Sequence, residues 1–199
     1  MARKKPIKLI TLDTETYNGL IGELKRIAIF DGEKVTYGYI FADVEKEMVS
    51  LSRKYQVHCY IHNIEFDARK MTGLFDKGKI NWKKSFVINN KLATIHTNKY
   101  ILHDSFKILP MGLRELSSDF EVEHGKLDLW EEVIKKYGDQ YTIYKDDGSV
   151  DNEKSLVNYL DQCDPDDPLY LQYLGYDVIS LYEILQKIIE IPGPTAADF

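Results

Sequence analysis

The feature that most constrains the fold is an apolar run near the N-terminus that ends in two carboxylates. Residues 7–12 indicate a buried strand, and Asp13 and Glu15 follow at once in the stretch LDTET. Side chains alternate between the two faces of a strand, so these two acids point to the same side. Acids beside a core are costly unless something positive binds them. A solvated strand face also carries such triplets, but the end of an apolar strand is where ligands tend to bind in α/β sheets.

The following residues alternate between strand and helix patterns. Two β-rich runs flank Asp31-Gly32, a turn signal typical of a hairpin, and together with 7–12 they predict three adjacent antiparallel strands. A short helix is expected after residue 61, with Asn63 as its N-cap and its end near Gly73. The other expected elements are a helix within 43–55, a strand at 56–61, two or three short strands within 85–105 with a turn at Asn98-Lys99, and a polar helix within 111–120.

The last third of the chain changes character. Residues 121–168 are acidic, and we interpret them as an insertion or lid, with a helix near 127–138 and a turn at Asp147-Gly148. From residue 168 on, apolar residues at three- and four-residue spacing predict a long amphipathic helix that ends at Pro192-Gly193-Pro194. Strands first and mixed helices later indicate an α/β fold with a mixed sheet, and 199 residues predict one domain, 1–199.

Composition excludes several classes of protein. A formal net charge of −6 argues against a histone-like protein that holds nucleic acid by general positive charge, although it does not exclude a nuclease with a carboxylate metal site. The two cysteines, Cys59 and Cys163, cannot form a disulfide framework or a zinc ligand pattern. Neither a signal peptide nor an apolar run of membrane-spanning length is present, so we expect a cytoplasmic protein with no membrane partner.

Two more stretches place an acid near a strand end or an apolar stripe. Asn63 and Asp67 lie four residues apart after the strand 56–61, and Tyr173 and Asp177 lie four residues apart in the last helix. Taken alone, Asn63 is a helix cap, Asp67 a first-turn acid, and Tyr173 the partner of a surface hydrogen bond to Asp177. Likewise, His62 alone is an ordinary polar residue at a strand end. Each signal is modest, and only the ordered set is specific.

As a set, the three motifs resemble the 3′–5′ exonuclease domain of family B DNA polymerases, a ribonuclease H-like DEDD nuclease with a tyrosine. The resemblance is strongest to the protein-primed polymerases of bacteriophages. The motifs of that family read D-x-E-T, H-N-x-x-F-D and Y-x-x-x-D, and they stand here at 13–16, 62–67 and 173–177. The stretch HDSFKILP, 103–110, is similar to a family segment that grips single-stranded DNA. The resemblance covers nearly the whole chain.

The resemblance implies two-metal hydrolysis of a phosphodiester at the 3′ end of single-stranded DNA, as in proofreading. Two Mg²⁺ or Mn²⁺ ions suit a site made of carboxylates. Asp13 would bridge both ions, Glu15 and Asp177 would complete one site, and Asp67 would hold the second ion. Tyr173 would orient the attacking water. Contacts to the last nucleotides are expected from Thr16, His62, Asn63, Phe66, Ser105 and Phe106, although core packing is the alternative for both phenylalanines.

Several alternatives stay open at this stage. The family uses a lysine in this insertion, for which Lys135 and Lys136 are candidates and Lys126 a weaker one. Polymerase motifs are absent from the 199 residues, so we expect a polymerase module in cis or in trans. The other readings are a stand-alone exonuclease acting on RNA or oligonucleotides, and a non-catalytic platform that binds a terminal-protein primer or DNA.

Overall fold

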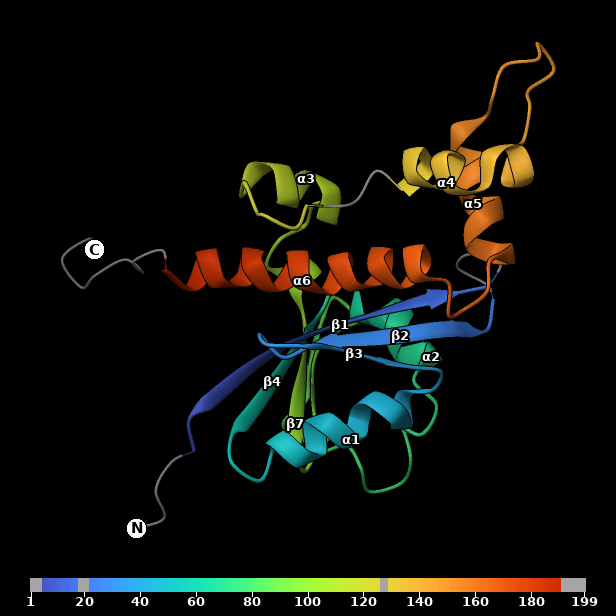
Figure 1. Cartoon of the computed structure of the whole chain (residues 1–199). Helices are drawn as coiled ribbons and strands as arrows, with labels where there is room; N and C mark the ends of the chain where they lie inside the picture. The colour runs from blue at the N-terminus through green and yellow to red at the C-terminus, as the bar shows by residue number, and fades with distance from the viewer. Residues whose placement is uncertain (1–4, 18–21, 126–128, 191–199) are drawn as a thin grey trace.

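A seven-stranded mixed sheet forms the centre of the molecule. The computed structural model describes residues 5–17, 22–125 and 129–190, without the side chain of Glu190. The strand order is β3-β2-β1-β4-β7-β6-β5, in which β1 pairs with β4, and β4 with β7, in parallel, while the other pairs are antiparallel. The strands are β1 (Ile7–Thr16), β2 (Leu24–Phe30), β3 (Val35–Gly38), β4 (Gln56–Ile61), β5 (Phe86–Ile88), β6 (Lys91–His96) and β7 (Tyr100–Asp104) (Figure 1).

The first strand is longer than predicted. The antiparallel trio of β1, β2 and β3 is confirmed, but β1 does not end at Leu12. Its ladder with β2 continues as far as Thr16, which pairs with Leu24 after a register shift between Glu15 and Thr16. Asp13 and Glu15 are therefore held inside a paired strand, which fixes their direction more firmly than a loop would.

The helices agree with most of the sequence expectations. They are α1 (Phe41–Leu51), α2 (Ile64–Lys70), α3 (Leu113–Asp119), α4 (Leu129–Tyr137), α5 (Asn152–Gln162) and α6 (Pro168–Glu190), with short 3-10 turns η2 (Ser105–Lys107) and η3 (Gly138–Tyr141). The predicted proline stop after α6 lies outside the described residues. Helix α5 was not predicted because its sequence is mostly polar and buries only Ser155 and Tyr159, which leaves little apolar periodicity to read.

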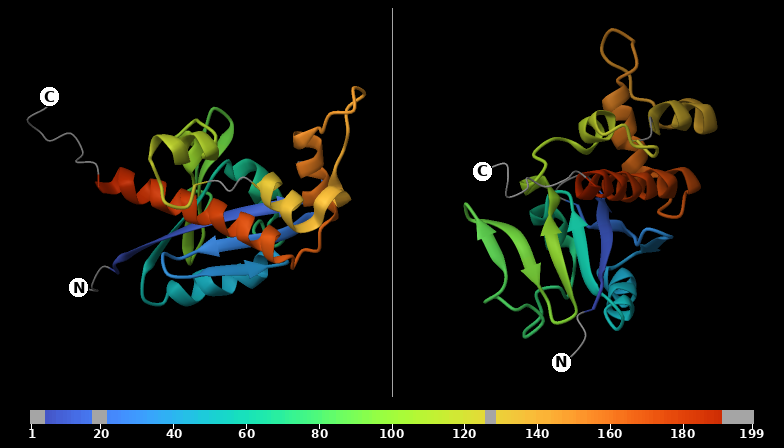
Figure 2. Two further views of the ribbon diagram at one scale, coloured as in Figure 1. Left: turned by 45° about the horizontal axis from the view of Figure 1, so that its top comes forward. Right: turned by 90° about the vertical axis from the view of Figure 1, so that its left-hand side faces the viewer.

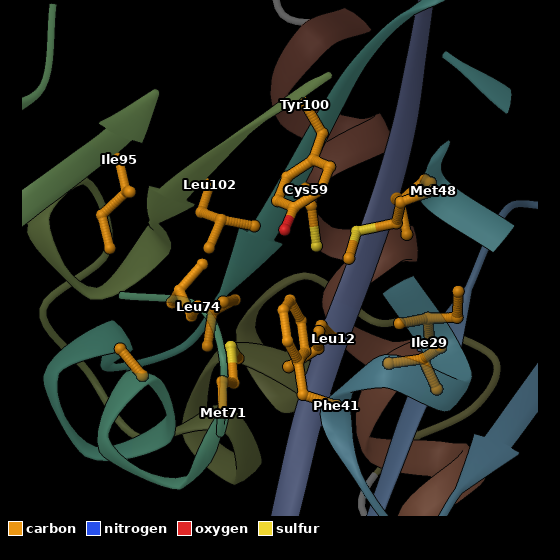
Figure 3. Close-up of a cluster of buried hydrophobic side chains, with 14 of the residues drawn as sticks. Leu12, Ile29, Phe41, Met48, Cys59, Met71, Leu74, Ile95, Tyr100 and Leu102 are labelled. Carbon is orange, nitrogen blue, oxygen red and sulfur yellow. The ribbon is translucent and has the colours of Figure 1, made fainter. Parts of the chain in front are cut away.

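Two layers of helices cover the sheet. The main core lies on one face, where α1 and α2 pack against apolar side chains such as Leu12 of β1, Cys59 of β4 and Leu102 of β7 (Figure 3). On the other face α6 runs across β1 and β2, and its Leu174 and Val178 pack against Ala28 (Figure 1). The polar side of β1 thus faces α6, while the apolar side faces the core.

Helices α4 and α5 form a small unit at the N-terminal end of α6, away from the sheet (Figure 1). They share a second cluster with the start of α6 that includes Trp130, Tyr159 and Tyr170. The buried Lys25 of β2 reaches this unit, because its Nζ donates a hydrogen bond of 2.5 Å to the Leu160 carbonyl oxygen. The interpretation of 121–168 as an insertion or lid stays a prediction. Among the described residues, no helix has the length and apolar character needed to cross a membrane.

Candidate active site

Three carboxylates from two distant segments meet between β1 and α6. The hydroxyl of Thr11 donates a hydrogen bond of 2.6 Å to the Val178 carbonyl oxygen, which sets α6 against the polar face of β1. Asp177 precedes Val178, and Asp13 follows Thr11 on the same strand face. As a result, oxygens of Asp13, Glu15 and Asp177 lie within 4.8 Å of one another. The prediction that these three acids share a site agrees with this geometry.

A cavity opens over this cluster. It has a volume of about 370 Å³. Its walls come from the end of β1, the start of α2, the first turn of α3 and the middle of α6. The lining residues are Leu12, Asp13, Thr14, Glu15, Thr16, His62, Phe66, Asp67, Leu113, Asp177 and Leu181. Seven of the eleven predicted site residues therefore line one concave surface: Asp13, Glu15, Thr16, His62, Phe66, Asp67 and Asp177.

Asp67 reaches the cavity from the opposite side of β1. It lies on α2, is 1% exposed, and accepts a hydrogen bond of 2.5 Å from the hydroxyl of Thr14. Thr14 points away from Asp13 and Glu15, so Asp67 is not a member of the three-acid cluster. The pKa of Asp67 is raised to about 7, chiefly by burial and in smaller part by the charge of Asp104, against the lowering effect of the Thr14 hydrogen bond.

The raised pKa of Asp67 predicts a pH-dependent stability of the metal-free protein. The folded chain holds this proton more tightly than the unfolded chain, so stability is lost as the pH rises from about 4 to about 7. Asp67→Asn removes the titration and keeps an acceptor for Thr14. We expect the variant to gain stability over the wild type across this window, by an amount of the order of 3 kcal/mol. Thermal unfolding in EDTA at pH 5 and pH 8 measures the gain. The prediction would be contradicted if the stability gain of Asp67→Asn over the wild type were the same at both pH values. It would also be contradicted if the exposed variant Asp146→Asn showed the same gain.

Tyr173 is placed beside the three-acid cluster. It lies one helical turn before Asp177, and only 6% of its surface is exposed. Burial raises the pKa of its phenol above the ordinary value, and the charges of Asp177, Glu15 and Asp13 raise it further. The hydroxyl therefore keeps its proton at neutral and moderately alkaline pH and remains a hydrogen-bond donor next to the carboxylates.

His62 is held firmly in one orientation. Its Nε2 lies 2.9 Å from the Met111 carbonyl oxygen, which can only accept, so Nε2 carries a proton. Its Nδ1 lies 3.1 Å from the Ser105 hydroxyl oxygen. Ser105 is fully buried and also donates to the Ile61 carbonyl oxygen. Ser105 thus has no exposed surface in this structure and contacts His62, and its expected contact with DNA stays a prediction.

Asn63 differs from its expected role as a side-chain cap. It occupies the N-cap position of α2 in the left-handed conformation, with φ 74°, and its side chain makes no capping hydrogen bond. Because Asn63 stands outside the helical conformation, the shared helical face expected for Asn63 and Asp67 is wrong. Its side chain is exposed, and its backbone N–H donates to Asp104 Oδ1 at 3.1 Å.

Asp104 positions two of the predicted contact residues, a role that the sequence analysis did not assign to it individually. The same Oδ1 that receives the Asn63 N–H also accepts the Phe106 N–H at 3.0 Å, so one buried carboxylate joins the ends of β4 and β7. This arrangement sets the half-exposed ring of Phe106 edge-on to His62, with ring centroids 5.4 Å apart. An acid that directly follows an apolar strand was the available signal. The charge of Arg114, on the first turn of α3, also lies within electrostatic range of Tyr173.

Two of the candidate lysines, Lys135 and Lys136, do not line the cavity. Lys135 pairs with Glu132 at 3.9 Å, and Lys136 pairs with Asp167 at 3.2 Å. Lys126 lies outside the described residues. A catalytic role for any of the three stays a prediction.

Comparisons with known proteins identify the fold. No protein-family model and no curated protein sequence matches the chain. Among solved structures, it is similar to phi29 DNA polymerase complexed with single-stranded DNA, with a TM-score of 0.61 and 14% identity over 97% of this chain. A second phi29 DNA polymerase structure, a post-translocation complex with primer-template DNA, matches with a TM-score of 0.53 and 16% identity over 97% of the chain. In both cases the chain spans 34% of the polymerase, about a third of its length. The fold is ribonuclease H-like, as predicted. At this level of identity, the likeness shows the fold alone.

Proposed function

We propose that the protein is a metal-dependent 3′–5′ exonuclease that removes nucleotides from single-stranded DNA ends. The observation that carries this proposal is the meeting of Asp13, Glu15 and Asp177 within 4.8 Å in a cavity that Asp67 also lines. Four acids in one partly enclosed space repel one another unless cations bind there. Phosphodiester hydrolysis is a reaction that uses such a set.

The donor set fits Mg²⁺ or Mn²⁺. All four side chains offer carboxylate oxygens, which are the ligands these ions prefer, and histidine or cysteine is not required. Asp13, Glu15 and Asp177 would hold one ion, and Asp67, which lines the same cavity, would take part in holding the second. When bound, the ions supply an activated water and neutralise the charge that develops on the phosphate.

The other residues act by position. Tyr173 keeps its phenolic proton and stands next to the carboxylates, so it can orient the attacking water by a hydrogen bond. Thr16 and Phe66 line the cavity, where they can contact the sugar and base of the terminal nucleotide. His62 also lines the cavity, the ring of Phe106 lies edge-on to His62, and Asn63 is exposed at the N-cap of α2.

We further propose that this activity proofreads for a protein-primed family B polymerase of phage origin. The fold of phi29 DNA polymerase and the order of the three motifs support this assignment. The polymerase module, in cis or in trans, and a terminal-protein primer are the partners it implies, and 1–199 would be one exonuclease domain. DNA is favoured over RNA because one of the similar structures holds single-stranded DNA.

A labelled-strand assay tests the proposal. Single-stranded DNA and RNA of equal sequence carry a 5′ label and are incubated with the protein in Mg²⁺ or in EDTA. We expect a ladder of products that shortens from the 3′ end, is stronger for DNA, and disappears in EDTA. A 3′ label should be released at once as a mononucleotide. If the protein binds the strands but cleaves neither of them in Mg²⁺ or in Mn²⁺, the exonuclease proposal is wrong. The alternative of a non-catalytic binding platform would then be supported.

A further inference from the structure

A segment of opposite charge to the rest of the chain lies along the edge of the sheet. Residues 75–91, FDKGKINWKKSFVINNK, contain five lysines and one aspartate, a net charge of +4 in a chain of −6. Three aromatic residues alternate with these lysines. We call the exposed set Phe75, Trp82, Lys83, Lys84, Phe86 and Lys91 the aromatic–lysine strip.

The aromatic side chains of the strip are unusually exposed. The exposed fractions are 47% for Phe75, 59% for Trp82 and 61% for Phe86, whereas the other tryptophan, Trp130, is 5% exposed. The rings of Phe75 and Trp82 lie nearly parallel, at 12°, with centroids 6.4 Å apart. Exposed apolar rings that are held in order usually mark a surface with a ligand or a partner.

The lysines of the strip are also available. Lys83, Lys84 and Lys91 are exposed, and within the described residues none of them forms an ion pair. Lys79 shows the contrast, because it is half-buried and pairs with Glu45 at 2.7 Å. Three unneutralised cations in an acidic protein favour an anionic ligand.

The strip lies on the edge of the sheet, four strands from β1, and one of its ends is at the same end of the sheet as Phe106. Strand β5 is one of the two edge strands, and it is seen among the green strands at the sheet edge remote from α6 in the right-hand view of Figure 2. Because Thr94 of β6 pairs with His103 of β7, the turn at Asn89-Asn90 lies at the end of the sheet that carries Phe106. The Trp82 end lies toward the opposite end, since the Asn81 N–H bonds to the His96 carbonyl oxygen at 2.7 Å.

We propose that the aromatic–lysine strip is a second binding site, for single-stranded nucleic acid, that holds the strand upstream of the end in the cavity. Bases stack on the exposed rings and the lysines contact phosphates, which is how sequence-independent sites hold single strands. The unpaired edge of β5 also suits pairing with a second copy of the chain, but the lysines that flank β5, Lys84 and Lys91, oppose such pairing. Binding of single-stranded nucleic acid by the strip does not depend on the cleavage chemistry, whereas its role upstream of an end held in the cavity rests on the proposed function.

Length dependence of DNA binding tests the proposal. Binding of labelled dT20 and dT4 is measured by fluorescence anisotropy in EDTA, which prevents cleavage. Lys83→Glu with Lys84→Glu should weaken dT20 binding at least about tenfold and reduce the slope of log affinity against log salt by about 1.4, since each phosphate contact contributes about 0.7. Binding of dT4, which is too short to occupy the cavity and reach Lys83 and Lys84 at the same time, should change by less than about twofold. The matched control is Lys145→Glu with Lys154→Glu on the α4–α5 unit, which alters the net charge equally and should leave both affinities unchanged.

Tryptophan fluorescence provides the second readout. The chain has two tryptophans, and Trp130 is buried, so quenching by DNA should report Trp82. We expect dT20 to quench the wild type and not Trp82→Phe, which keeps a stacking ring, while Trp82→Ala should weaken dT20 binding about tenfold. Equal dT20 affinity for the wild type and the lysine variant would overturn the site. If the lysine and tryptophan variants change only the oligomeric state, measured by light scattering, and not DNA binding, the proposed nucleic-acid site is also wrong. The strip would then be assigned to a protein partner. If the protein shows this binding pattern but does not cleave DNA, the exonuclease proposal is wrong, and the strip remains a nucleic-acid binding site.

Discussion

Replacing Asp13 with Asn and Glu15 with Gln should lower the rate of DNA shortening by about a thousandfold or more. The two amides keep the shape of the carboxylates but remove two negative charges from the three-acid cluster, so cations no longer bind there with useful affinity. The rate is measured on 5′-labelled single-stranded DNA at saturating Mg²⁺. Circular dichroism should show an unchanged fold.

The matched control for this pair changes two exposed acids remote from the cavity. Asp146→Asn with Glu153→Gln alters the net charge by the same amount on the α4–α5 unit, and we expect the wild-type rate. Mg²⁺ should raise the melting temperature of the wild type and of this control, but not of the Asp13 and Glu15 variant, because ligand binding stabilises only a chain that has the site. If the double variant keeps a tenth of the wild-type rate, the three-acid cluster is not required for catalysis.

Tyr173→Phe should lower the maximal rate by about a hundredfold and leave the affinity for single-stranded DNA within a factor of about two. The substitution deletes only the hydroxyl that donates a hydrogen bond beside the carboxylates, and the buried ring stays in place. Single-turnover kinetics separate the rate of cleavage from binding, which anisotropy in EDTA measures directly.

Tyr176→Phe is the control for this variant. Tyr176 lies on the same helix, and its ring contacts His124, away from the residues that line the cavity. Because the pKa of Tyr173 is raised, the wild-type rate should show no loss from ionisation of this phenol up to about pH 10. If Tyr173→Phe instead weakens DNA binding and leaves the single-turnover rate unchanged, Tyr173 belongs to substrate contact and not to catalysis.

The sequence alone determined the elements whose signals are local. The hairpin of β2 and β3, strand β4 and the long helix α6 follow from turn chemistry and from periods of 2 and 3.6 residues. The same periods place Asp13 and Glu15 on one strand face, and Tyr173 and Asp177 on one helix face. These pairs needed no knowledge of the fold.

Only the tertiary structure decided how the pairs meet. The hydrogen bond from Thr11 to Val178 spans 167 residues, and it brings Asp177 to Asp13 and Glu15. The approach of Asp67 to Thr14 from the other face of β1, the burial of Ser105 and the left-handed Asn63 likewise depend on contacts between distant segments. Helix α5 leaves too little periodicity to be read because it buries few side chains. The LDTET stretch therefore specifies two carboxylates on one face of a strand. The packing of α6 and α2 around β1 makes these carboxylates part of a site. The sequence could not show this packing because its periodicity reports only neighbours along the chain.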